Sequence, residues 1–121
     1  MPNSTQYQAV ISSNLTATIA NTASLSDAMD LSGTTLAGYI MPASWTSANM
    51  TFQVSVDGTN FHNFYDQFGN EVSHTVSTSR FVALNPSDMA SVRYIKFRSG
   101  TNGTPVAQGA DRLITLVSRA V

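Results

Sequence analysis

Few residues in this sequence have the chemistry of a catalytic or metal-binding site, and the two histidines come first among them. His62 and His74 each lie in a strand-like run, and the sequence holds neither an HxxxH nor an HxH pair. A zinc site needs several ligands that converge on one point, and the chain has no cysteine to supply thiolates. We therefore expect both histidines to be structural residues, and we expect no cofactor.

Acidic and amide side chains near the predicted turns offer oxygen ligands for a hard cation such as calcium. Asp57, Asp66, Asn70 and Glu71 are of this kind, but the segment 66–71 lacks the alternating oxygen ligands of a calcium loop. Hydrogen bonding within turns explains these residues better. No pair of acids stands out for glycoside hydrolysis, and no Gly-x-Ser-x-Gly, P-loop or Gly-x-Gly-x-x-Gly motif is present. The sequence predicts a protein that is not an enzyme.

Aromatic side chains offer a different chemistry, the stacking of sugar rings. We take Trp45, Phe61 and Tyr65 as candidate glycan contacts, with Phe64 as a further ring in the same segment. The alternative is that these rings belong to the core, because burial is the usual role of a large aromatic side chain.

A short basic stripe surrounds Tyr94 and consists of Arg93, Lys96 and Arg98. Nucleic-acid binding usually requires a positively charged surface, and the isoelectric point of this chain is near 6.0. We therefore expect no nucleic-acid partner. The stripe then belongs to a solvated strand or to a contact between subunits. We take Arg93, Lys96 and Arg98, together with Tyr7, as candidate interface residues.

The clearest structural pattern in the chain is a hairpin over residues 50–66. From Met50 to Val56 every second residue is apolar, which predicts a strand with one apolar and one polar face. Asp57-Gly58 supplies a turn, because glycine accepts a positive φ and aspartate hydrogen-bonds to nearby backbone. Residues 61–66 return as a second, aromatic-rich arm.

Further short strands are expected along the rest of the chain, at 7–11, 15–19, 24–31, 36–41, 71–76, 80–84, 92–98 and 112–118, with turns or loops at 43–49 and 85–88. Apolar residues on both faces of 112–118 predict a central or subunit-contacting strand. Eight or nine strands with no long helix predict an all-β fold, a single antiparallel β-sandwich. Residues 1–23 are expected to form an N-terminal arm or edge strands, and 24–121 the sandwich domain.

Length and composition indicate the number of domains and the kind of surface that this chain has. Its 121 residues suit one domain, and the sequence shows neither a signal peptide nor an apolar run long enough to cross a membrane. Charged residues make up only 11%, and the first 79 residues contain acids but no lysine or arginine. A surface with so few charges is weakly protected against association, so we expect a chain that packs against neighbours. The alternative is an ordinary β-protein surface rich in serine and threonine.

Two segments resemble landmark strands of galactose-binding-like (discoidin-type) jelly rolls. They are Ser55-Val-Asp-Gly-Thr-Asn-Phe61 and Val92-Arg-Tyr-Ile-Lys-Phe97, which together with their surroundings cover about a third of the chain. The resemblance implies a jelly-roll β-sandwich. The sequence departs from that pattern in having Phe61 where tryptophan is common, which weakens the implied sugar site more than the implied fold.

A resemblance to small virion structural proteins of tailed phages and prophages covers most of the chain after Leu25. It is carried by the segments 31–48, 51–58 and 97–106, including Tyr-Ile-Met-Pro-Ala-Ser-Trp and Phe-Arg-Ser-Gly-Thr-Asn-Gly-Thr-Pro-Val. It implies a protein made in the host cytoplasm and located in the virion. There it would decorate or cement the capsid as a homo-oligomer, through contacts with the major capsid protein or other virion proteins. Neither a membrane nor a nucleic acid is expected as a partner. Two alternatives remain open: a tail or spike-base module that binds glycans, and a free carbohydrate-binding module.

Overall fold

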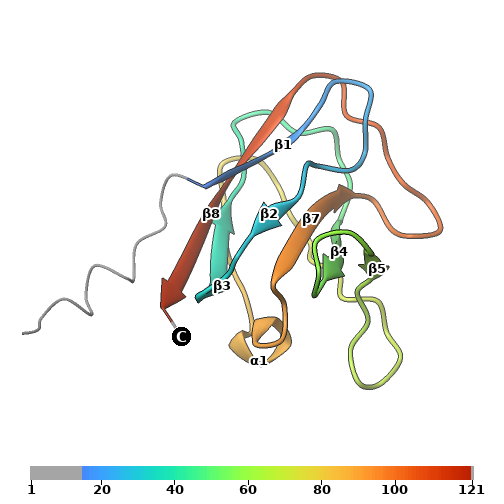
Figure 1. The fold of residues 1–121 in the computed structure, drawn as a ribbon. Coiled ribbons are helices and arrows are strands. Elements are labelled where there is room, and N and C mark those ends of the chain that lie inside the picture. Colours follow the sequence, from blue (N-terminus) through green and yellow to red (C-terminus); the bar gives the residue numbers. More distant parts are fainter. Residues whose placement is uncertain (1–14, 121) are drawn as a thin grey trace, which may run out of the picture.

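The computed structural model describes residues 15–120 and shows two antiparallel β-sheets packed face to face (Figure 1). Each sheet has four strands, so the predicted single antiparallel β-sandwich is confirmed. The elements are β1 (Thr16–Ile19), β2 (Met29–Asp30), β3 (Thr34–Ile40), β4 (Met50–Ser55), β5 (His62–Asn63), β6 (Phe81–Ala83), the one-turn helix α1 (Pro86–Met89), β7 (Tyr94–Ser99) and β8 (Arg112–Ala120).

Sheet A has the strand order β1-β8-β3-β6. β8 pairs with β1 on one side and with β3 on the other, which confirms the central position predicted for residues 112–118. The register between β3 and β8 shifts between Leu36 and Gly38. This irregularity allows both Leu36 and Tyr39 to be buried on the same side of the strand, although three positions separate them.

Sheet B has the strand order β2-β7-β4-β5. The long pairing of β7 with β4 runs from Met50↔Ser99 to Ser55↔Tyr94. Ile95 and Phe97 of β7 are fully buried, as the alternation of that segment predicts. The opposite face of β7 carries Tyr94, Lys96 and Arg98.

An aromatic cluster fills the space between the sheets. Phe52 of β4 lies edge-to-face with Phe97 of β7 at a centroid distance of 5.2 Å, and Tyr39 of β3 meets Phe97 at 5.1 Å. His74 completes the cluster at 5.1 Å from Phe52. Rings packed in this geometry add roughly 0.5–1.5 kcal/mol per pair beyond the area they bury. The cluster therefore ties β3, β4 and β7 together across the sandwich.

The hairpin predicted over residues 50–66 is present but shorter than expected. β4 pairs with β5 only at Gln53↔Asn63 and Val54↔His62. The strand ends at Ser55, whose hydroxyl accepts hydrogen bonds from the backbone N–H groups of Asp57 and Gly58. Val56, expected on the apolar face, is therefore outside the strand and is 73% exposed.

The polar face predicted for β4 is also not the solvated surface that the alternation indicates. Thr51 is fully buried and Ser55 is 2% exposed. The hydroxyl of Thr51 donates to the carbonyl of Gly100 at 2.6 Å and accepts from Arg98 Nε at 3.0 Å. Residues far along the chain thus cover this face of β4.

Several weaker predictions can be compared with the structure. Residues 24–31 contribute only the two-residue β2 and a bridge from Leu25 to Arg98, and residues 71–76 form no strand but bridge at Glu71 and His74. Residues 43–49 are a loop, as expected. Asn85 is the N-cap of α1, and its side chain accepts a hydrogen bond from the Ser87 N–H at 3.0 Å.

The amino-terminal part of the chain enters sheet A at its edge. Among the described strands β1 pairs with β8 alone, and Ala17 and Ile19 are fully buried in the core. Residues 1–14, with the strand predicted at 7–11, lie outside the described residues. Within residues 15–120, no helix has the length and apolar character needed to cross a membrane.

Candidate functional site

Arg98 lies inside the domain, although the sequence nominates it for an interface. Its Nη2 is 2.7 Å from Oε2 of Glu71, and its Nη1 donates to Oδ1 of Asn63 at 3.0 Å. Only 6% of its side chain is exposed. A guanidinium with these partners is used to hold β7, β5 and the segment around Glu71 together, so we remove Arg98 from the candidate interface.

The other two basic residues of the stripe are accessible but lie in different surroundings. Lys96 places its Nζ 4.3 Å from the ring centroid of Phe61, an arrangement typical of a cation–π contact. Arg93 donates from Nε to the hydroxyl of Ser32 at 2.9 Å and lies over the ring of Tyr94. Tyr7, the fourth predicted interface residue, lies outside the described residues.

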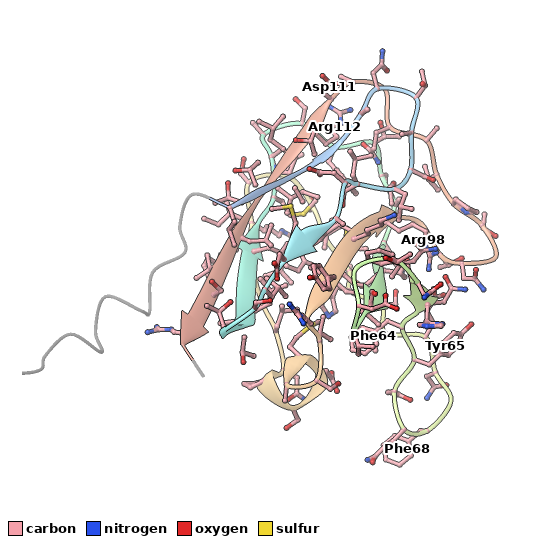
Figure 2. All side chains as sticks on the ribbon, viewed as in Figure 1. Phe64, Tyr65, Phe68, Arg98, Asp111 and Arg112 are labelled. Atoms are coloured by element: carbon pink, nitrogen blue, oxygen red, sulfur yellow. The ribbon has the colours of Figure 1, made fainter. Side chains whose placement is uncertain are left out.

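The three predicted glycan contacts do not form one platform. Trp45 is half-buried against the core, and its Nε1 donates to the carbonyl of Ala48 at 3.1 Å. The neighbouring Thr46 hydrogen-bonds to Arg112, which lies at the end of the sandwich opposite Phe68 (Figure 2). The ring of Phe61 is in contact with the ammonium group of Lys96. Tyr65 lines a hollow in the surface that includes neither Trp45 nor Phe61.

That hollow, here called the α1-end groove, has a volume of about 510 Å³. Two of its residues are strongly exposed aromatic rings, Tyr65 at 48% and Phe68 at 79%. It lies between the loop that follows β5 and the region of α1, and its lining residues are Phe64, Tyr65, Asp66, Gln67, Phe68, Val72, Asn85, Ser87, Asp88 and Ser91. Rings, hydroxyls, amides and carboxylates therefore meet in one place, and no lysine or arginine lines it.

A tight turn holds Phe68 at the tip of its loop (Figure 2). One carboxylate oxygen of Asp66, Oδ1, accepts from the N–H groups of both Phe68 and Asn70, at 2.9 and 3.0 Å. The Asp66 N–H donates to the Asn70 carbonyl at 2.8 Å, and Gly69 adopts a φ of +85°. The exposed ring is thus presented by a turn whose backbone is fixed by several hydrogen bonds.

The histidines show no convergence on a metal. Nδ1 of His74 lies 2.8 Å from the hydroxyl of Tyr39, and the two rings stack. Burial lowers the pKa of His74, while the nearby carboxylate of Asp88 opposes that shift. Among residues 15–120, no group of three histidine, aspartate or glutamate side chains is placed to hold a metal ion.

A second surface feature is the outer face of sheet A, the side turned away from the core. Phe81 of β6 is 59% exposed, Leu113 of β8 is 54% exposed and Ile40 of β3 is 39% exposed. Ile40 pairs with Phe81 of β6 and with Thr115 of β8, and Leu113 lies two residues from Thr115 on the same face of β8. Exposed apolar side chains therefore occur on three adjacent strands. The remaining outward positions, read from the strand alternation, are Thr16, Thr18, Thr35, Gly38, Ala83, Thr115, Val117 and Arg119.

Close packing fixes Phe81 on this face. A Cβ added to Gly38 would lie 2.7 Å from Cε1 of Phe81, so the ring of Phe81 lies directly over Gly38. Along the four strands as described, Arg119 is the one charged residue at an outward position, and it lies near the end of β8. The outer face of sheet A consequently carries apolar and threonine side chains and almost no charge.

Sequence reasoning missed most of these residues. Phe68 sits in a segment that reads only as a turn, and Asn85 and Asp88 read as helix-capping or turn residues. The groove forms because α1 and the loop after β5 lie side by side, a tertiary contact that no local pattern reveals. Phe81 and Leu113 could have been found from the two-sided apolar pattern of their strands.

Comparisons with known proteins add no relative. No family model, no curated protein and no solved structure matches this chain significantly. The resemblances to phage virion proteins and to galactose-binding-like jelly rolls stay predictions.

Proposed function

We propose that the protein is a structural component of a tailed-phage particle, attached to the capsid by protein–protein contacts. The observation that carries this proposal is the outer face of sheet A, with Phe81, Leu113 and Ile40 exposed across three strands. The sequence resemblance to small virion proteins and the low fraction of charged residues support the same conclusion.

The physical argument concerns the cost of removing water from this face. Burial of apolar area is favourable by roughly 25 cal/mol per Å². A charged side chain at the centre would have to be desolvated and paired, whereas the outward positions between Phe81 and Leu113 are occupied by small, apolar or threonine side chains. The centre of this face can therefore be covered by an uncharged surface of a neighbour without leaving a charge unpaired.

We assign this face to the major capsid protein or another virion protein as partner. In a particle, the same weak contact is repeated at every equivalent position of the lattice. If the subunits are also joined to one another as a homo-oligomer, each attached subunit raises the effective concentration of the next. A modest apolar face is then sufficient for stable attachment.

Mass spectrometry of purified particles of the phage that encodes the chain tests the proposal. Heads and tails are separated, and copies of the protein are counted relative to the major capsid protein. We expect the protein in the head fraction, in numbers comparable to those of the capsid protein. Its absence from particles overturns the proposal, and a few copies confined to the tail fraction would replace the capsid role with the tail-module alternative.

A further inference from the structure

The α1-end groove combines exposed aromatic rings with neutral and acidic hydrogen-bonding groups, and this combination suits a specific class of ligand. We propose that the groove binds a neutral carbohydrate, with Tyr65 and Phe68 as stacking residues. Asp66, Asn85, Asp88 and Ser91, which line the same hollow, supply hydrogen-bonding groups for sugar hydroxyls. This activity is separate from attachment through sheet A, because the groove includes no residue of the outer face of sheet A.

Sugar rings need two kinds of contact at once. Their C–H faces are apolar and pack flat on aromatic rings, while their hydroxyls at the rim both donate and accept hydrogen bonds. The groove offers both, since Tyr65 and Phe68 are 48% and 79% exposed and the other lining residues bring carboxylate, amide and hydroxyl groups. A volume of about 510 Å³ lies within the roughly 300–1,000 Å³ typical of small-molecule sites.

The charge of the groove selects against anionic ligands. Asp66 and Asp88 line it and no lysine or arginine does, so a phosphate, a sulfated glycan or a nucleic-acid backbone would meet repulsion without compensation. The same argument disfavours an anionic membrane surface, which attracts basic rather than acidic segments. Carboxylates instead are strong acceptors for the hydroxyl donors of an uncharged sugar.

The fixed turn beneath Phe68 strengthens the case for binding. An aromatic ring on a flexible loop loses conformational entropy when it is captured, whereas a ring on a preformed turn has already lost part of it. Four hydrogen bonds within residues 66–70 hold the turn. Two are accepted by Asp66 Oδ1, one runs from the Asp66 N–H to the Asn70 carbonyl, and one runs from the Gly69 N–H to the Asp66 carbonyl. Phe68 is therefore preorganised for contact while remaining in water.

The test uses the full chain on an array of immobilised oligosaccharides. The array holds neutral glucose, galactose and N-acetylglucosamine oligomers beside sialylated and sulfated members, and the best neutral oligomer is then titrated by calorimetry. We expect binding to neutral members that is weakened roughly tenfold or more by Phe68→Ala and by Tyr65→Ala, because central aromatic contacts dominate small binding sites. Both side chains are exposed, so both variants should fold.

The matched control is Phe81→Ala, which removes an aromatic ring of similar exposure (59%) from sheet A. It should leave oligosaccharide binding unchanged. The proposal is overturned if no neutral member binds, if charged members bind best, or if Phe68→Ala and Tyr65→Ala bind as the wild type does. Loss of binding in Phe68→Ala together with unchanged attachment to particles would separate this site from the proposed capsid role.

Discussion

At the scale of single residues, the buried ion pair between Arg98 and Glu71 is a feature that the sequence did not predict. Arg98 Nη2 lies 2.7 Å from Glu71 Oε2, and the two side chains are 6% and 16% exposed. Asn63 and Thr51 accept further hydrogen bonds from the same guanidinium. A buried cation with this many partners is stable only while its anion remains in place.

Glu71→Ala should therefore destabilise the fold by ~3 kcal/mol, near the lower end of the range for removing one partner of a buried pair. The double variant Glu71→Ala/Arg98→Met should be more stable than Glu71→Ala alone, because it no longer buries an unpaired guanidinium. Urea unfolding of the single and double variants measures both effects. If the loss of stability in the double variant equals the sum of the losses in Glu71→Ala and Arg98→Met alone, the two residues are not coupled.

His74 makes the stability of the protein depend on pH. Burial lowers its pKa from the ordinary value of 6.5, so the unfolded chain binds a proton at His74 more readily than the folded protein does. The stability that follows from this difference is fully present above pH 6.5 and is lost as the pH falls through 6.5 toward the folded-state pKa. The hydrogen bond with the Tyr39 hydroxyl positions the ring in the core.

We expect a lower free energy of unfolding at about pH 5.5 than at about pH 7.5, with the difference reduced in His74→Gln. Denaturant titrations at the two pH values measure it. His62→Gln, at an exposed position of β5, is the matched control and should keep the wild-type difference. Equal pH dependence in His74→Gln and the wild type would contradict the assignment to His74. Hydrogen bonds also lower the pKa of Asp30, mainly through Ser32, and the pKa of Asp57, mainly through Asn60. These two carboxylates affect the free energy of unfolding only at more acidic pH.

At the scale of elements, the contact between β3 and β6 depends on a glycine. A Cβ at Gly38 would lie 2.7 Å from Cε1 of Phe81 and 2.9 Å from the carbonyl oxygen of Val82. The second of these atoms belongs to the backbone, so the clash cannot be relieved by turning a side chain alone. Gly38 therefore sets how closely β6 approaches β3 and how Phe81 lies on the outer face of sheet A.

Gly38→Ala should lower the free energy of unfolding by about 1–3 kcal/mol, the usual cost of forcing atoms into a packed site. Gly103→Ala is the matched control, because a Cβ there meets nothing within 4 Å, and its effect should stay within about 0.5 kcal/mol. Thermal and urea unfolding of the two variants measure the difference. Equal stability of both variants would show that β6 can move away from β3 at little cost.

The same elements show what the sequence could predict. The alternation of apolar residues in β4 and β7 predicted Phe52, Ile95 and Phe97 in the core, because a strand repeats every two residues. The burial of Thr51 and Arg98 could not be predicted, since the groups that cover them, Gly100 and Glu71, come from distant segments. The prediction for Val56 was wrong because the strand ends at Ser55, whose hydroxyl accepts hydrogen bonds from the backbone of the following turn.

The groove illustrates the same limit at the level of the site. Tyr65 could be nominated as an exposed aromatic near a turn, but its partner Phe68 stands alone in a turn sequence. The two become neighbours of Asn85 and Asp88 only when α1 lies beside the loop after β5. Local patterns thus predict strands and core faces, whereas hollows between loops depend on tertiary packing.

At the scale of the whole molecule, the sandwich presents two distinct surfaces. The outer face of sheet A presents apolar and threonine side chains and is nearly uncharged, and it carries the proposed attachment to the particle. The α1-end groove carries exposed rings and acidic side chains, and none of its lining residues belongs to the outer face of sheet A. A subunit attached through sheet A could therefore still expose Phe68 to an external ligand.

The measurement that tests the central claim most directly is the number of copies per purified particle for variants of the outer face of sheet A. A phage lacking its own copy of the gene is complemented with wild type, with Phe81→Ser/Leu113→Ser, or with Val56→Ser, whose side chain is exposed but lies outside sheet A. We predict wild-type occupancy for Val56→Ser and loss of most copies for the double variant, although the isolated double variant remains folded. Full occupancy by a folded Phe81→Ser/Leu113→Ser protein would contradict the account.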